Sequence, residues 1–161
     1  MLSEAQIKRV WEGMLGAEIR ASYFAELVER ANKEQRLLTW ATLLMSSGAV
    51  GAALVQLSPD YSFLRIVLPV GTGGASLFSL VRANPKRAID AADLHMRWSK
   101  LALEYEKLWE NVYADDAASK LDTLSGQAIE VSKASTSFPN EPGRMRKWEH
   151  HVIHHRLPVR A

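Results

Sequence analysis

The chain has 161 residues, with 20 lysines and arginines against 18 aspartates and glutamates, and a formal net charge of +2. It has no cysteine, which excludes disulfide bonds and thiolate chemistry. A chain of this length normally forms one small globular domain. Its charged residues, however, lie almost wholly outside residues 37–81, so the composition indicates an apolar segment between two polar ones.

The first 36 residues are charged and helical in pattern, and they contain no cleavable signal sequence. Ser3 and Gln6 have the spacing of a capping box, which predicts a helix start. Because Gly13 and Gly16 interrupt the pattern, we expect a separate short helix over 3–15. A heptad-like apolar stripe predicts one packed helical face: Val10, Met14, Ala17, Ala21, Phe24, Val28 and Ala31.

Two apolar stretches occupy residues 37–81. The first contains no charged side chain from Leu37 to Leu57, and the second extends to Val81. A helix rises about 1.5 Å per residue, so each stretch can cross a hydrocarbon core about 30 Å thick. The break at residues 58–61 is so short that the stretches must run antiparallel. The pattern predicts a two-pass transmembrane hairpin; the alternative is a soluble bundle with two fully buried helices.

Charges at the ends of the hairpin predict its orientation. Arg65 lies near the start of the second stretch, where its long side chain can reach the headgroups. The connecting break carries only Asp60, whereas basic residues flank the hairpin on its other side: Lys33, Arg36, Arg82, Lys86 and Arg87. The positive-inside rule therefore predicts an inner-membrane protein with both termini in the cytoplasm.

Small residues within both stretches predict close packing of helices: Ser47, Gly48 and Gly51 in the first, and Pro69, Gly71, Gly73 and Gly74 in the second. These residues either only pack the hairpin or also gate a pore, because Pro69 interrupts helical hydrogen bonding. No charged residue lies in the middle of either stretch, which argues against an ion-coupled transporter.

A second amphipathic region, residues 82–134, follows the hairpin. Asn84 and Pro85 predict a helix start. A regular apolar stripe then indicates a long helix: Ala91, Leu94, Trp98, Leu101, Tyr105, Leu108 and Val112. The pattern breaks at Asp115 and Asp116, and it resumes in a shorter helix that folds back: Ala117, Leu121, Leu124, Ala128 and Val131.

The stripe of the long helix has two interpretations. It either packs only within the chain or also mediates self-association. Two flanking helices give a thin core, so we expect a homo-oligomer that forms through the larger stripe residues: Leu94, Trp98, Leu101, Tyr105, Leu108 and Val112.

The C-terminal tail, residues 135–161, is basic and rich in histidine. A loop over 135–143 is predicted to precede a last helix over 144–155. Four basic residues can contact anionic lipid headgroups or a nucleotide phosphate, or can form a solvated helix face: Arg144, Arg146, Lys147 and Arg156.

The tail also places His150 with His154, and His151 with His155, one helical turn apart. Such pairs can share a zinc or nickel ion. The order does not match the H-E-x-x-H motif, which excludes a metalloprotease of that type. We interpret these residues as a surface cluster in a mobile tail and predict no metal site.

No serine–histidine–acid arrangement and no paired carboxylates in a pocket-forming context point to catalysis. We therefore predict that the chain is not an enzyme, uses no cofactor and binds no nucleic acid. The predicted fold is all-α, with a transmembrane hairpin over 37–81 that continues into a cytoplasmic helical bundle or coiled coil formed by residues 1–36 and 82–134.

Several of these features together resemble the SLATT superfamily, the SMODS and SLOG-associating two-transmembrane effector domain of prokaryotic conflict systems. The resemblance covers residues 17–131. It rests on the two spans, the exit through Asn84 and Pro85, and helix residues on both sides: Arg20, Tyr23, Ala88, His95, Trp98, Leu101, Tyr105 and Leu108. These are helix patterns rather than catalytic signatures.

The resemblance implies a membrane effector of antiviral defence. Such proteins accompany nucleotide-second-messenger synthases or nucleotide sensors, and they are expected to oligomerise and permeabilise the inner membrane on activation. This sequence carries no fused sensor or synthase domain, so we expect a trigger from a partner or a diffusible ligand. Two other functions stay open: a membrane-anchored coiled-coil scaffold that recruits a soluble partner, and a holin-like phage membrane protein.

Overall fold

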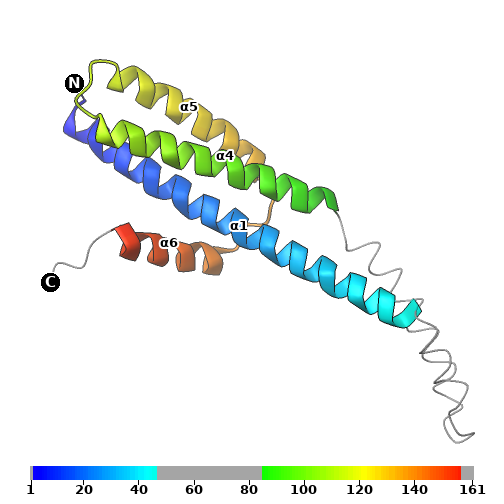
Figure 1. Ribbon diagram of the computed structural model, residues 1–161. Coiled ribbons are helices and arrows are strands. Elements are labelled where there is room, and N and C mark those ends of the chain that lie inside the picture. Colours follow the sequence, from blue (N-terminus) through cyan, green and yellow to red (C-terminus); the bar gives the residue numbers. More distant parts are fainter. Residues whose placement is uncertain (1, 47–84, 157–161) are drawn as a thin grey trace, which may run out of the picture. The chain divides into compact units, whose positions relative to one another are not determined.

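The computed structural model describes residues 2–46 and 85–156. Within these ranges the secondary structure consists of helices: α1 (Glu4–Ser46), α4 (Pro85–Glu110), α5 (Ala117–Ser135) and α6 (Pro142–Arg156) (Figure 1). No strand occurs in the described part of the chain, which confirms the predicted all-α class. The chain divides into two units, one formed by residues 1–28 with 89–161 and the other by residues 29–88.

α1 begins with the predicted capping box. The backbone N–H of Ser3 donates to Oε1 of Gln6 at 2.8 Å, and the backbone N–H of Gln6 donates to Oγ of Ser3 at 3.3 Å. The first backbone N–H groups of a helix have no partner within the helix, so this reciprocal pair fixes where α1 starts.

The prediction of a separate short helix over 3–15 was wrong, because α1 continues through Gly13 and Gly16. Glycine inside a helix costs about 1 kcal/mol relative to alanine. Close packing explains why glycine occupies position 13, because a Cβ atom there would lie 2.7 Å from the ring of Tyr105. The glycine that suggested a helix break is therefore a point of close approach between two helices.

In the first unit, α1 and α4 run antiparallel. Residues later in α1 contact residues earlier in α4. The contacts are Trp11 with Trp109, Gly13 with Tyr105, Arg20 with Trp98, and Ala21 with His95. This regular series requires the two helices to remain side by side through several turns.

α5 folds back along α4, as the sequence predicted. After the turn at residues 111–116, the start of α5 lies beside the end of α4. Further along, a hydrogen bond joins the side chains of Tyr105 and Ser125, and Nε1 of Trp98 donates to Oγ of Ser135 at 3.1 Å. The unit is thus an antiparallel three-helix bundle with α6 resting on it (Figure 1).

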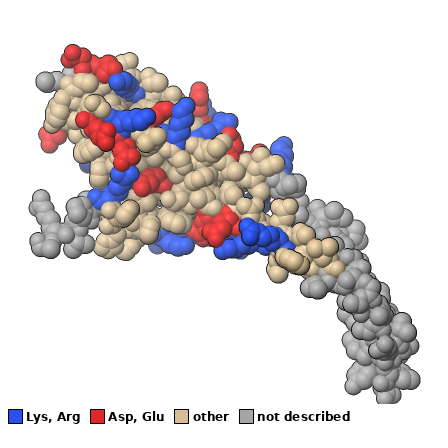
Figure 2. Space-filling model, in the orientation of Figure 1, with Lys and Arg blue, Asp and Glu red and all other residues tan. Residues whose placement is uncertain are grey.

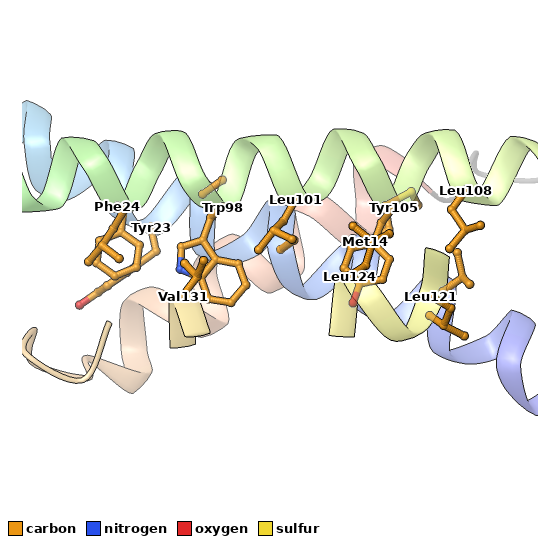
Figure 3. Close-up of a cluster of buried hydrophobic side chains, with 14 of the residues drawn as sticks. Met14, Tyr23, Phe24, Trp98, Leu101, Tyr105, Leu108, Leu121, Leu124 and Val131 are labelled. Carbon is orange, nitrogen blue, oxygen red and sulfur yellow. The ribbon is translucent and has the colours of Figure 1, made fainter. Parts of the chain in front are cut away.

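The apolar stripes predicted from the sequence meet in the core of this bundle. The α4 stripe, which runs from Ala91 through α4 to Val112 in the turn after it, is buried in full, and its labelled side chains point toward Leu121, Leu124 and Val131 of α5 (Figure 3). Burying one large apolar side chain contributes about 1.5–3 kcal/mol. The stripe is therefore a main source of the bundle's stability.

The second unit contains the described residues 29–46 and 85–88. Along this part of α1, three large apolar side chains are exposed at intervals of three residues: Leu37 at 71%, Trp40 at 65% and Leu43 at 55%. No helix within the described ranges is both long and apolar enough to cross a membrane. Most of the predicted hairpin over 37–81, namely residues 47–81, lies outside the described residues.

Candidate functional site

The residues predicted to pack the spans or to gate a pore lie outside the described part of the chain: Ser47, Gly48, Gly51, Pro69, Gly71, Gly73 and Gly74. The residues predicted for self-association are described, and all are buried in the core of the first unit: Leu94, Trp98, Leu101, Tyr105, Leu108 and Val112. In this conformation the stripe holds its own bundle together. Self-association of the chain stays a prediction.

Three of the residues that carry the family resemblance lie close together where α1 meets α4: Arg20, His95 and Trp98. The Cζ atom of Arg20 lies 5.0 Å from the ring centroid of Trp98, and its Nη1 donates to the carbonyl of Gly16 at 3.0 Å. Burial lowers the pKa of Arg20, but a guanidinium remains charged. Nδ1 of His95 lies 2.9 Å from the carbonyl oxygen of Ala21. Because a carbonyl only accepts, this hydrogen bond places a proton on Nδ1.

These contacts join α1 to α4, and Tyr23 extends the connection to the loop before α6. Its Oη donates to the carbonyl of Pro139 at 2.7 Å. Beside it, the rings of Phe24 and Phe138 meet edge to face with centroids 5.5 Å apart. The loop that precedes α6 is therefore held against α1.

The surface on which α6 rests is the candidate functional site, and one carboxylate dominates its first half. Oε2 of Glu26 accepts hydrogen bonds from Nε1 of Trp148 at 2.6 Å and from Nζ of Lys147 at 3.2 Å. Nε of Arg144 lies 3.9 Å from the other carboxylate oxygen and 3.0 Å from Oε2 of Glu141. Glu26 thus fixes the first two turns of α6 against α1.

Arg156 fixes the other end of α6. Its Nε donates to Oε2 of Glu18 at 3.0 Å, and its Nη1 donates to Oε1 of Glu106 at 2.6 Å. The hydrogen bond to Glu106, assisted by the charge of Glu18, raises the pKa of Arg156. One arginine therefore connects α6 to both α1 and α4.

Apolar contact between α6 and the bundle is small. Val152 is the buried residue of α6, while Met145 and Trp148 are partly buried. Nη1 of Arg144 is buried and has no hydrogen-bond partner among the described residues, and such a group costs about 1–3 kcal/mol. Partly exposed ion pairs contribute about 0–1 kcal/mol each. α6 is consequently held less firmly than α5, which buries four side chains.

Three of the four basic residues predicted to contact anions are paired with carboxylates of the chain: Arg144, Lys147 and Arg156. Arg146 is exposed. On the face shown in Figure 2, acidic and basic side chains are interspersed rather than gathered by sign. The docked α6 therefore offers less positive charge to an anionic surface than its sequence suggests.

The histidines of α6 form the two pairs that the sequence predicted. The ring centroids of His150 and His154 are 4.9 Å apart, and those of His151 and His155 are 6.4 Å apart. All four side chains are exposed. Within residues 2–46 and 85–156, no group of three or more histidine, aspartate or glutamate side chains is placed to hold a metal ion.

Sequence reasoning missed the carboxylates that hold α6. Glu18 and Glu106 each follow a buried stripe residue, and Glu26 comes two residues after Phe24. The position of these acidic residues at the edge of a buried stripe was the only local indication of their role. Their partners lie 50 to 138 positions away in the sequence. No local pattern identifies partners at such distances.

Comparisons of the chain with protein-family models, with curated proteins and with solved structures found no match.

Proposed function

We propose that the chain is a two-pass inner-membrane effector of a prokaryotic antiviral defence system. In this proposal the bundle of α1, α4, α5 and α6 lies in the cytoplasm, and residues 37–81 form the membrane hairpin. A nucleotide-second-messenger synthase or sensor activates the protein, which then assembles and permeabilises the membrane.

The observation that carries this proposal is the course of α1. The helix begins in the packed bundle and continues without interruption to Ser46, ten residues into the first apolar stretch. There Leu37, Trp40 and Leu43 are each more than half exposed. Exposed large apolar side chains on a helix that leads into an uncharged segment are suited to contact with lipid rather than water.

Assembly through the buried α4 stripe is too costly energetically. Exposing its six larger side chains would cost on the order of 10 kcal/mol. That is comparable to the whole stability of a small domain, about 5–15 kcal/mol. The proposed assembly must therefore use a surface that is already exposed.

The outer side of α4 provides such a surface for a second copy of the chain. Ile89, Met96 and Leu103 are all more than half exposed, and they recur at intervals of seven residues. A seven-residue repeat keeps apolar side chains on one side of a helix that pairs with another helix. Copies anchored in one membrane with the same orientation would present these sides to one another in parallel.

The membrane assignment is tested first, by washing membranes from expressing cells with alkaline carbonate. We expect the protein to remain in the membrane pellet, because a hydrophobic hairpin resists extraction by high pH. Release into the soluble fraction would contradict the proposal and would favour the soluble helical bundle.

The effector function is tested by dye and ion leakage from induced cells, with and without a co-expressed nucleotide synthase or sensor encoded beside the protein. Leakage that requires the second protein supports a gated effector. Leakage without it favours a holin-like protein. Absence of leakage in both cases, with the protein in the membrane fraction, favours an anchored scaffold.

A further inference from the structure

The four histidines of α6 lie on an ordered, docked helix rather than in the mobile tail that the sequence suggested. His150 and His154 lie two residues before and after the buried Val152. Two residues turn a helix by about 200°, so this pair lies on the side opposite Val152 and faces solvent. His151 and His155 lie closer to the flank of the helix.

The distance between the first two rings matches that of two imidazoles on one metal ion. Zinc lies about 2.0–2.1 Å from each ligating nitrogen, and two ligands at tetrahedral or right angles have ring centroids about 4.5–5.2 Å apart. The centroids of His150 and His154 are 4.9 Å apart, with ring planes inclined at 73°. These side chains are already at the separation that shared ligation requires.

The second pair lacks this geometry. The rings of His151 and His155 are nearly parallel, at 21°, and their centroids are 6.4 Å apart. The ring of His151 also meets the indole of Trp148 edge to face at 5.5 Å. Ligation by this pair would require both side chains to move, and one of them to leave its aromatic contact.

The side chain of Lys147, three residues before His150, is directed away from the first pair. Nζ of Lys147 lies 3.2 Å from Glu26 and 5.0 Å from the ring centroid of Trp148, so its charge is turned toward α1. Ion pairing with that carboxylate reduces its repulsion of a bound metal ion. The exposed position of His150 and His154 leaves room for water to complete the coordination.

We propose that His150 and His154 bind one first-row divalent transition-metal ion, such as Cu²⁺, Ni²⁺ or Zn²⁺. Neutral imidazole suits these metals, and Cu²⁺ should bind most tightly of the three. The ion joins consecutive turns of α6 and stabilises its C-terminal half, which carries Arg156. The site requires no membrane insertion, so it stands independently of the proposed function.

The test uses full-length protein purified in detergent without a polyhistidine tag, titrated with Cu²⁺ or Zn²⁺ alone by calorimetry. We expect one ion per chain at the tightest site. His150→Gln or His154→Gln should weaken binding by about tenfold or more, because losing a ligand costs at least as much as losing an outer-shell partner. The matched variants His151→Gln and His155→Gln should retain the affinity of the unaltered chain.

Hydrogen exchange provides a second measurement. Metal should slow exchange of α6 backbone amides in the unaltered chain and in His151→Gln, but not in His150→Gln. Equal weakening by all four variants would indicate a diffuse histidine patch and would overturn the proposal. Unchanged affinity in the double variant His150→Gln/His154→Gln would also overturn it.

Discussion

At the scale of single residues, Gly13 shows how a residue that disfavours a helix can stabilise a fold. An added Cβ would meet the ring of the buried Tyr105, so we predict that Gly13→Ala lowers the free energy of unfolding by about 1–3 kcal/mol. Gly126 of α5 has nothing within 4 Å of its Cβ position. Gly126→Ala should therefore stabilise the protein, by up to about 1 kcal/mol.

Chemical denaturation of both glycine variants measures this difference. The two substitutions remove the same residue type from a helix and differ in what surrounds it. If both variants were stabilised, the ring of Tyr105 would have to move aside with little loss of stability. The close approach of α1 and α4 would then not require glycine.

Tyr105 also predicts a pH dependence. Burial raises the pKa of its phenol above the ordinary 10.0, against an opposing effect of the Ser125 hydrogen bond. The folded state then holds the proton more tightly than the unfolded state. Its contribution to stability is complete below pH 10 and is lost as the pH rises through the folded pKa. The free energy of unfolding should therefore fall less steeply above pH 10 in Tyr105→Phe.

The exposed Tyr113 provides the matched control for this measurement. Tyr113→Phe should leave the slope of stability against pH unchanged, whereas Tyr105→Phe should reduce it. Identical slopes in the unaltered chain and both variants would show that Tyr105 does not govern the alkaline limit. Below pH 10, the loss of one hydrogen bond should lower the stability of Tyr105→Phe by about 1 kcal/mol.

At the scale of elements, α6 differs from the other helices because polar contacts hold it. Glu26→Gln removes the charge that faces Lys147 and Arg144, and we expect it to weaken α6 docking by about 1–2 kcal/mol. Glu29→Gln is the control, because Glu29 and Lys33 are both largely exposed. Its effect should stay below about 0.5 kcal/mol.

Hydrogen exchange of the α6 amides measures this docking directly. Exchange should be faster in Glu26→Gln, and 1 M salt should reduce the difference between this variant and the unaltered chain, because the Debye length falls to about 3 Å. An α6 that exchanges at the same rate in both proteins would show that the charge of Glu26 does not hold the helix. The predicted docking through Glu26 would then be wrong.

The difference between local and long-range contacts explains which elements the sequence could predict. The capping box of α1 and the turn before α5 depend on residues within a few positions of one another, and the structure confirms them. The continuity of α1 past Gly13 depends on Tyr105, 92 positions later in the chain. A local pattern contains no information on such a contact.

At the scale of the whole molecule, the sequence predicted which side chains form the core but not which surface remains for a partner. An apolar stripe indicates that a helix packs, but it does not distinguish its own chain from a second copy. The structure places the α4 stripe against α1 and α5. The carboxylates that hold α6 were equally hidden from the sequence, because exposed and ion-paired acidic residues have the same local pattern.

Self-association is therefore predicted to depend on the outer side of α4. Met96→Glu places a charge in the middle of the exposed repeat of Ile89, Met96 and Leu103, so it should shift the protein toward monomer in detergent without changing its thermal unfolding. The buried-stripe variant Leu101→Ala should lower the unfolding free energy by about 2–5 kcal/mol. While it remains folded, its oligomeric state should not change. Sedimentation velocity separates the two effects. A Leu101→Ala protein that is folded but monomeric would show that the buried stripe, and not the outer side of α4, mediates self-association.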